Sequence, residues 1–388
     1  MQTQLPSSLL NTRDGQRADE ILRRCVHCGF CNSTCPTYQL LGDELDGPRG
    51  RIYLIKGMLE RDTADRVSAM HLDRCLTCRA CETTCPSGVE YGELIEIGRA
   101  FASRKLSSSW FISRLLKIVP EPQALRRMMT LGRIFRPLLP SKIRNLLRKK
   151  PHSEELSSVS SVKGANIVLL KGCVQRVVTP EVNEHLMTLL AARGVEIELN
   201  DSEQCCGSLE LHTGSTEAAK ERMRSNIEAI DAVGVQTIVS TASGCGVTLK
   251  EYGRLLQDES ARVFSEKVVD VSEFLVDYDF GKRDDIDTVA WHPPCSLQHG
   301  QKIEGIVEKI LTKTGYQLVP VKDSHLCCGS AGAYSLTQPR ISNELRDRKV
   351  TNLTDKKPDA IVTSNIGCQM HIGGGTDTLV LHWLELLR

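Results

Sequence analysis

The chain has 388 residues, enough for more than one hydrophobic core, so we expect two or three domains. Its 49 Lys and Arg residues nearly balance its 48 Asp and Glu residues, and the net charge of +1 excludes a general attraction to nucleic acid or to an anionic membrane. There is no apolar run of about eighteen residues and no signal-peptide pattern in Met1–Arg13, so the sixteen cysteines predict a cytoplasmic protein with metal or redox chemistry.

The first cysteines form a C-x2-C-x2-C-x3-C-P motif that occurs twice, 50 positions apart. This is the ligand run of bacterial ferredoxins, in which the fourth cysteine binds the other cluster. We therefore predict two 4Fe-4S clusters with crossed ligation. Their ligands are Cys25, Cys28, Cys31 and Cys85 for one cluster, and Cys75, Cys78, Cys81 and Cys35 for the other. A pair of zinc sites is the alternative, but zinc rarely uses a C-x2-C-x2-C run.

The segment between the two motifs is longer than a minimal ferredoxin needs. Arg51–Glu60 has apolar residues at helical spacing, namely Ile52, Leu54, Ile55, Met58 and Leu59. We therefore predict a helical ferredoxin domain over residues 1–105. His27 lies between two predicted ligands, and we expect it to face solvent or to form hydrogen bonds, because cubane clusters prefer thiolates.

A basic segment follows, with thirteen basic residues and one acidic residue between Phe101 and Lys150. Its apolar residues are spaced as in short amphipathic helices broken by prolines, and a Ser-rich linker comes next, so we assign 106–162 to a basic helical segment and linker. The charge suits an anionic membrane surface near a quinone pool, or an acidic partner subunit. Packed helices with solvated charges are the alternative. Residues suited to test this are Arg126, Arg127, Arg133 and Arg136.

Beyond the linker, short β-branched runs alternate with helical stretches. The predicted strands are Ile167–Leu170, Val195–Leu199, Thr237–Ser240, Thr288–Trp291, Gln317–Val321 and Ala360–Thr363. Helices are predicted over Pro180–Ala192 and Thr216–Val233. This alternation predicts two α/β (Rossmann-like) domains with parallel sheets, over 163–278 and 279–388.

The remaining cysteines form a second repeat, displaced by 122 or 123 positions. Its copies are Cys173, Cys205, Cys206 and Cys245, and Cys295, Cys327, Cys328 and Cys368. Each follows a predicted strand or opens a helix, where open α/β sheets bind ligands. Because buried adjacent thiolates need a cation, we predict an additional metal site, an iron–sulfur cluster or zinc, shared between the two copies. A metal-free pair of domains with buried thiols is the alternative.

The C-x31-C-C-G motif followed by a fourth cysteine resembles the CCG domain, and a helical dicluster ferredoxin followed by two such domains covers essentially the whole chain. The stretches 25–59, 241–252 and 323–334 look most like the glycolate oxidase iron–sulfur subunit. CCG domains with a non-cubane cluster generally end in C-x2-C, whereas Thr248 and His371 stand here. The cluster type therefore does not carry over, and His371 is either a substitute ligand or a structural histidine.

This resemblance implies an electron-transfer subunit without catalytic residues of its own, in a complex that oxidises glycolate to glyoxylate. FAD would be bound by partner flavoprotein subunits, and electrons would pass to a quinone or another acceptor. The complex would be cytoplasmic or peripheral on the inner face of the membrane, without nucleic acid. Alternatives are an iron–sulfur subunit for lactate utilisation or anaerobic glycerol-3-phosphate oxidation, a heterodisulfide reductase-like thiol redox protein, and a non-catalytic assembly scaffold.

Overall fold

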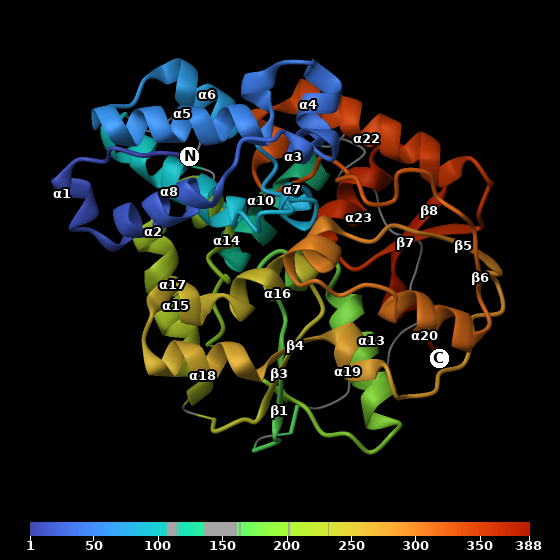
Figure 1. Ribbon diagram of the computed structural model, residues 1–388. Coiled ribbons are helices and arrows are strands. Elements are labelled where there is room, and N and C mark those ends of the chain that lie inside the picture. The colour runs from blue at the N-terminus through green and yellow to red at the C-terminus, as the bar shows by residue number, and fades with distance from the viewer. Residues whose placement is uncertain (107–113, 115, 136–160, 163, 201, 232) are drawn as a thin grey trace.

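The computed structural model describes residues 1–106, 114, 116–135, 161–162, 164–200, 202–231 and 233–388. Figure 1 shows a helical N-terminal region, in blue, above two sheets that are coloured green to yellow and orange to red. Most of the predicted basic segment and linker lies outside the described residues. Within the described part of the chain, no helix is both long and apolar enough to cross a membrane.

The N-terminal region is entirely helical. Its elements are α1 (Ser7–Leu10), α2 (Arg13–Arg24), α3 (Phe30–Ser33), α4 (Pro36–Leu41), η1 (Glu44–Asp46), α5 (Pro48–Arg61), α6 (Arg66–Asp73), α7 (Ala80–Thr83) and α8 (Tyr91–Lys105). Side chains that accept hydrogen bonds from first-turn amides begin two of the longer helices, Thr12 for α2 and Asp65 for α6. Fully buried residues of α2, α5 and α8, such as Leu22, Ile55 and Leu94, form the core. The predicted helix in the segment between the cysteine motifs is confirmed as α5.

Two four-stranded parallel sheets follow, with the strand orders β2-β1-β3-β4 and β6-β5-β7-β8. Their strands are β1 (Ile167–Leu170), β2 (Glu198–Leu199), β3 (Thr237–Ser240), β4 (Val268–Asp270), β5 (Thr288–Trp291), β6 (Gln317–Leu318), β7 (Ala360–Thr363) and β8 (Leu379–His382). The central strands β1, β3, β5 and β7 have the predicted bounds. β2 and β6 are shorter than predicted, and the edge strands β4 and β8 were not predicted.

Helices connect the strands, as parallel pairing requires. In the first α/β unit they are α12 (Gln175–Val178), α13 (Pro180–Ala191), α14 (Ser208–His212), α15 (Thr216–Asp231), α16 (Ser243–Lys250), α17 (Tyr252–Leu256), α18 (Glu259–Lys267) and α19 (Val271–Leu275). In the second they are η3 (Ser296–Gly300), α20 (Ile306–Thr314), α21 (Tyr334–Thr337), α22 (Pro339–Thr354), α23 (Ile366–Gly373) and η4 (Trp383–Leu386). The predicted helices correspond to α13 and α15.

The two α/β units share one hydrophobic core, in which Leu169 and Leu186 of the first unit pack in the same cluster as Val289 and Trp383 of the second. Polar contacts continue this interface where α16 meets η3, with the Oγ atoms of Ser243 and Ser296 2.8 Å apart. The units therefore cannot move as independent domains without exposing core residues.

The helical N-terminal region docks onto both α/β units. Arg79 donates hydrogen bonds to the carboxylate of Glu251 on the first unit. On the second unit, the Tyr334 hydroxyl donates to the carbonyl of Arg74 at 3.1 Å, and Thr83 Oγ1 lies 3.1 Å from His299 Nδ1. The second cysteine motif thus faces both α/β units.

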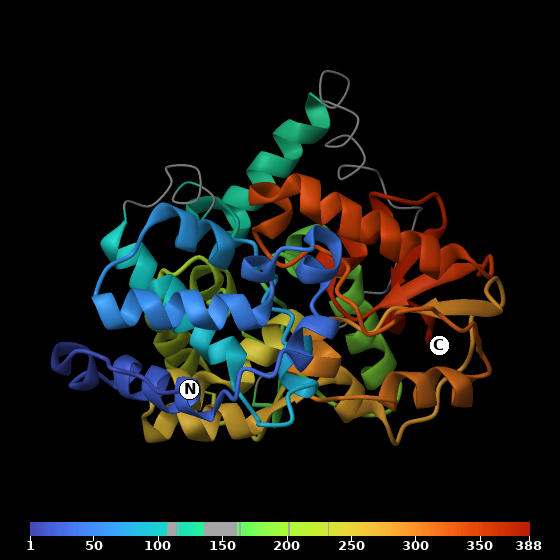
Figure 2. The same ribbon diagram turned by 45° about the horizontal axis from the view of Figure 1, so that its top comes forward.

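The described part of the basic segment contains α10 (Pro122–Ile134). Glu121 at its start pairs with Arg222 of α15 at 3.0 Å. Figure 2 shows this teal-green helix reaching away from the body of the molecule. Its outer surface is apolar at Met128, Leu131 and Ile134, each 46–64% exposed.

Candidate metal centres

The eight N-terminal cysteines gather into two groups of four. In the first group, burial and the neighbouring thiols of Cys25 and Cys85 raise the pKa of Cys31 to about 11. Burial likewise raises the pKa of Cys25, and the charges of Cys85 and Cys28 add to that effect. These four cysteines line one hollow, which Cys81 also reaches.

The second group has the reciprocal composition. Burial raises the pKa of Cys81 well above its usual value, and the charges of Cys78, Cys75 and Cys35 add to that effect. Burial also raises the pKa of Cys78, and the charges of Cys35 and Cys75 are among those that add to it. Each group therefore combines three thiols of one motif with the last thiol of the other, which is the arrangement that crossed ligation requires.

Left-handed residues give both cysteine loops the same turn. In the first motif these are His27 and Gly29, with φ of 59° and 87° on either side of Cys28. In the second, Thr77 and Arg79 take the same positions around Cys78, with φ of 53° and 60°. A non-glycine residue is uncommon in the left-handed backbone conformation, which costs free energy. Both loops nevertheless adopt it at the same two positions, so they share one backbone geometry despite different side chains. His27 is half-buried and its ring lies edge-on to Tyr53, and within the described residues its Nδ1 has no hydrogen-bond partner, which differs from the solvent-facing or hydrogen-bonded ring that we expected.

Two buried arginines balance the charge of the second group. Arg51 is 1% exposed and Arg99 is 6% exposed. Burial opposes ionisation of Cys75, but the positive charges of Arg51 and Arg99 and a hydrogen bond from the Thr77 amide, at 3.4 Å, give a net lowering of its pKa. Tyr91 also donates its hydroxyl to Cys75 Sγ at 3.6 Å. Cationic and hydrogen-bonding neighbours of this kind tune a cluster's reduction potential.

The first α/β unit brings its four cysteines together at the carboxyl ends of its strands. Cys173 donates to Cys205 Sγ at 3.4 Å, and this bond, together with one from Cys206, lowers the pKa of Cys205 well below its usual value. Hydrogen bonds to Cys205 and Cys245 raise the pKa of Cys206. The four sulfurs of this unit thus form one largely buried, hydrogen-bonded group.

The second α/β unit repeats the arrangement. Cys295 Sγ lies 3.8 Å from Cys327 Sγ, and Cys328 Sγ lies 3.3 Å from Cys368 Sγ. This group adjoins the second N-terminal group, since the charge of Cys295 contributes to raising the pKa of Cys78. Cys78, Cys295 and Cys327 meet in one small cluster of packed side chains.

The sulfur contacts of these eight cysteines lie within each copy, four and four. Our expectation of one site shared between the copies is therefore replaced by two separate groups, one in each α/β unit. The reason is that the copies pack through their cores and through α16 and η3, while each set of strand ends gathers its own cysteines. Eight thiols that meet mainly other thiols, in two largely buried groups, fit metal binding.

His371 is accounted for by structural hydrogen bonds. Its Nε2 lies 3.1 Å from the hydroxyl and 3.2 Å from the carbonyl of Ser342 on α22. The histidine that faces the cysteines is instead His292, directly after β5, whose ring lies within 4.8 Å of the sulfurs of Cys328 and Cys368. Sequence reasoning missed it, although its place three residues before Cys295 and directly after a strand was a usable signal.

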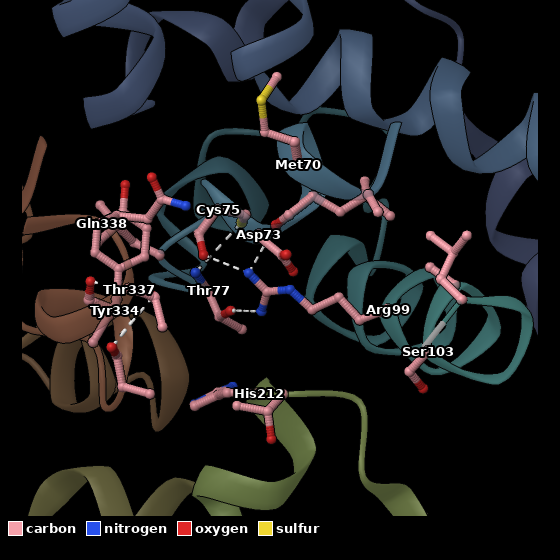
Figure 3. A pocket seen from close by; sticks show the side chains of 18 of the residues that line it. Met70, Asp73, Cys75, Thr77, Arg99, Ser103, His212, Tyr334, Thr337 and Gln338 are labelled. Atoms are coloured by element: carbon pink, nitrogen blue, oxygen red, sulfur yellow. Dashed lines mark hydrogen bonds between the residues drawn. The ribbon is translucent and has the colours of Figure 1, made fainter. Parts of the chain in front are cut away.

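A cavity of about 540 Å³ adjoins the second N-terminal group, with Cys75 in its wall. It is bounded by α6, α8, α14 and α21, and thus by all three parts of the fold. Figure 3 shows Arg99 reaching across it to Thr77 and Cys75, with His212 on the opposite side. Arg99 donates to Thr77 Oγ1 at 2.8 Å and to the carbonyls of Leu72 and Cys75 at 2.8 and 2.6 Å.

Comparison with protein families agrees with this organisation. Residues 21–89 match the 4Fe-4S dicluster domain, and residues 167–250 and 289–373 both match the cysteine-rich domain CCG. The chain thus joins a dicluster ferredoxin domain to two cysteine-rich domains, and this combination places it in the class of iron–sulfur proteins.

Full-length relatives identify the family. The chain is 44% identical to the glycolate oxidase iron–sulfur subunit of Escherichia coli K12, over 100% of this chain and 98% of the relative. It is 30% identical to the probable glycolate oxidase iron–sulfur subunit of Bacillus subtilis 168, over 92% and 90% of the two chains. It is also 29% identical to lactate utilization protein A of Oceanobacillus iheyensis, over 56% of this chain and 93% of the relative. The chain belongs to the family of glycolate oxidase iron–sulfur subunits.

Proposed function

We propose that this protein is the electron-transfer subunit of a flavin-linked 2-hydroxy-acid dehydrogenase that oxidises glycolate to glyoxylate. The observation that carries the proposal is the gathering of the N-terminal cysteines into two reciprocal groups of four, in a chain that aligns from end to end with glycolate oxidase iron–sulfur subunits. The chemistry of the substrate would belong to flavoprotein partners that bind FAD, and this chain would supply no catalytic residue.

The proposed ligands of the two 4Fe-4S clusters are the groups described above: Cys25, Cys28, Cys31 and Cys85, and Cys75, Cys78, Cys81 and Cys35. When bound, such clusters accept and release one electron at a time, which links a two-electron flavin to the next acceptor. The chain's own part is to hold the thiols and to surround the second group with Arg51 and Arg99. The domains we assign are 1–105, 163–278 and 279–388, with the basic segment and linker at 106–162.

We further propose that the cavity beside Cys75 receives the electron acceptor. Its wall combines apolar side chains, such as Met70 and Leu106, with the buried polar groups of Arg99 and His212. A quinone ring, apolar on its faces and polar at its carbonyl oxygens, suits such a lining. The exposed residues Arg66 and Met70 at its edge give it access to the surface.

A peripheral membrane contact through α10 would bring the protein to a quinone pool. The helix exposes Leu131 and Ile134 together with the cations Arg126 and Arg127, a combination that suits the surface of an anionic bilayer. The side chains of Arg133 and Arg136 lie outside the described residues.

The experiment is anaerobic purification from the native cell through a tag on this chain, with dehydrogenase assays of the co-purified complex on glycolate, lactate and glycerol 3-phosphate. We expect flavoprotein partners and the highest kcat/KM with glycolate. A preference for lactate would favour a lactate-utilisation subunit. Recovery without a flavoprotein, with thiol–disulfide activity in its place, would contradict the proposal.

A further inference from the structure

His292 is a buried histidine without a hydrogen-bond partner at its ring. Its side chain is 1% exposed, and within the described part of the chain neither Nδ1 nor Nε2 has a hydrogen-bond partner. Its backbone amide donates to the Val362 carbonyl at 2.8 Å. An imidazole with two unsatisfied nitrogens costs free energy in a folded interior, so an unpaired one needs an explanation.

The explanation lies next to the ring. A ring nitrogen of His292 and the sulfurs of Cys328 and Cys368 all lie within 4.8 Å of one another. These are soft and borderline donors that together bind iron, zinc or an iron–sulfur cluster. The remaining sulfurs of the copy belong to the same group, because Cys327 is adjacent to Cys328 in the chain and its sulfur lies 3.8 Å from that of Cys295.

Among the described residues of the first α/β unit, no histidine forms such a group with the cysteines. The position 122 residues before His292 is Leu170, which is buried in the same hydrophobic cluster as Cys173 and Cys205. A second difference lies on the following long helix, where the eleventh residue is Lys349 in α22 and Asn226 in α15. Lys349 is 2% exposed and donates to the carbonyls of Asp323 and Ser324 at 2.6 and 3.2 Å.

We propose that the cysteine-rich site of the second α/β unit holds an iron–sulfur cluster with His292 as a ligand beside the thiolates, and that the site of the first unit uses thiolates alone. The inference rests on the proposed function, in that it takes the cysteine-rich domains to be metal sites. Iron–sulfur chemistry is favoured over a structural zinc ion because this site adjoins Cys78, a proposed ligand of the second N-terminal cluster.

A histidine ligand would give the two sites different potentials. An imidazole ligand is neutral, and in Rieske centres, where imidazoles stand in place of thiolates, the reduction potential is higher. The buried cation of Lys349 also favours a higher reduction potential at this site. The duplicated domain therefore carries two unlike centres, with the one of higher potential beside the N-terminal clusters.

The test is pulsed EPR of the full-length protein, purified without oxygen and labelled with ¹⁵N-histidine, together with iron and zinc analysis. We expect a nitrogen coupling on one cluster that His292→Leu abolishes and His371→Leu leaves unchanged. His371→Leu is the matched control because it removes a buried histidine of the same domain. His292→Cys should keep the iron but lose the nitrogen coupling, which separates loss of a ligand from failure to fold.

The inference is overturned if the nitrogen coupling persists in His292→Leu, if the wild-type protein shows no coupling to histidine nitrogen, or if the second site contains zinc. In each of these results the two N-terminal clusters can still be present and reducible, so the proposed function would stand. Absence of all iron from correctly folded protein would instead refute the proposed function.

Discussion

The ion pair between Arg79 and Glu251 fastens the second cysteine motif to the first α/β unit. Arg79 lies between Cys78 and Cys81, and its Nη2 donates to Glu251 Oε2 at 2.9 Å. Arg254 donates to the same carboxylate oxygen at 2.9 Å. Both members of the first pair are largely buried, with side chains 12% and 21% exposed. We expect Glu251→Gln to loosen the loop that carries Cys78 and Cys81.

The magnitude follows from the pKa of Glu251. Burial alone would raise this pKa, but the bonds and charges of Arg79 and Arg254 lower it from 4.5 to about 2. Such a lowering corresponds to about 3 kcal/mol in favour of the ionised form. Because the pKa is lowered on folding, this stabilisation is complete above pH 4.5 and is lost as the pH falls toward 2. At pH 7 the variant should therefore lose most of it.

The assay is anaerobic hydrogen–deuterium exchange at pH 7, followed on peptides that cover residues 76–84. A loss of about 3 kcal/mol corresponds to about a hundredfold faster exchange of protected amides in the loop. Glu259→Gln is the matched control, because its pair with Arg262 is exposed at 73% and 54% and should leave exchange unchanged. If Glu251→Gln and the control behave alike, the ion pair does not fasten the loop and the reasoning is wrong.

Three further predictions concern ligation, membrane contact and the N-terminal core. Cys35→Ser should perturb the EPR signal of the cluster of the second motif, and selective loss of the first motif's cluster would contradict crossed ligation. Reversing Arg126 and Arg127 to Glu should weaken binding to anionic vesicles at low salt by about thirtyfold or more, at about 1 kcal/mol per cation. Unchanged binding would show that these charges are only solvated and do not contact a membrane. Asp46→Asn removes the charge 2.9 Å from both Arg74 Nη1 and His71 Nδ1 and should lower anaerobic unfolding stability by about 3 kcal/mol, whereas an unchanged denaturation midpoint would show that this buried charge does not matter.

The sequence predicts the fold best where a local pattern decides it. The central strands β1, β3, β5 and β7 are short β-branched runs in the middle of their sheets, and their bounds follow from that pattern. The edge strands β4 (Val268–Asp270) and β8 (Leu379–His382) escaped prediction because one is three residues long and the other follows a glycine run. Their pairing with β3 and β7 depends on tertiary structure, which a short run does not reveal.

The candidate sites show the same division. The fixed spacing predicts which N-terminal cysteines belong together, because a C-x2-C-x2-C loop brings three thiols to one side, and the crossed ligation itself stays a prediction. The choice between one shared site and two separate ones depended on how the copies pack, which spacing does not contain. His292 was missed and His371 considered instead, since only the fold shows that Ser342 engages His371 while the ring of His292 faces Cys328 and Cys368.

The central claim is that electrons from a 2-hydroxy acid reach the clusters of this chain. The most direct measurement is rapid-freeze EPR after oxidised complex, purified without oxygen, is mixed with glycolate. We predict that reduced 4Fe-4S signals grow as the flavin is reoxidised, and that Cys81→Ser removes the signal of the second cluster. If the flavin is reduced and the clusters of the wild-type complex stay oxidised throughout turnover, this chain is not the electron carrier.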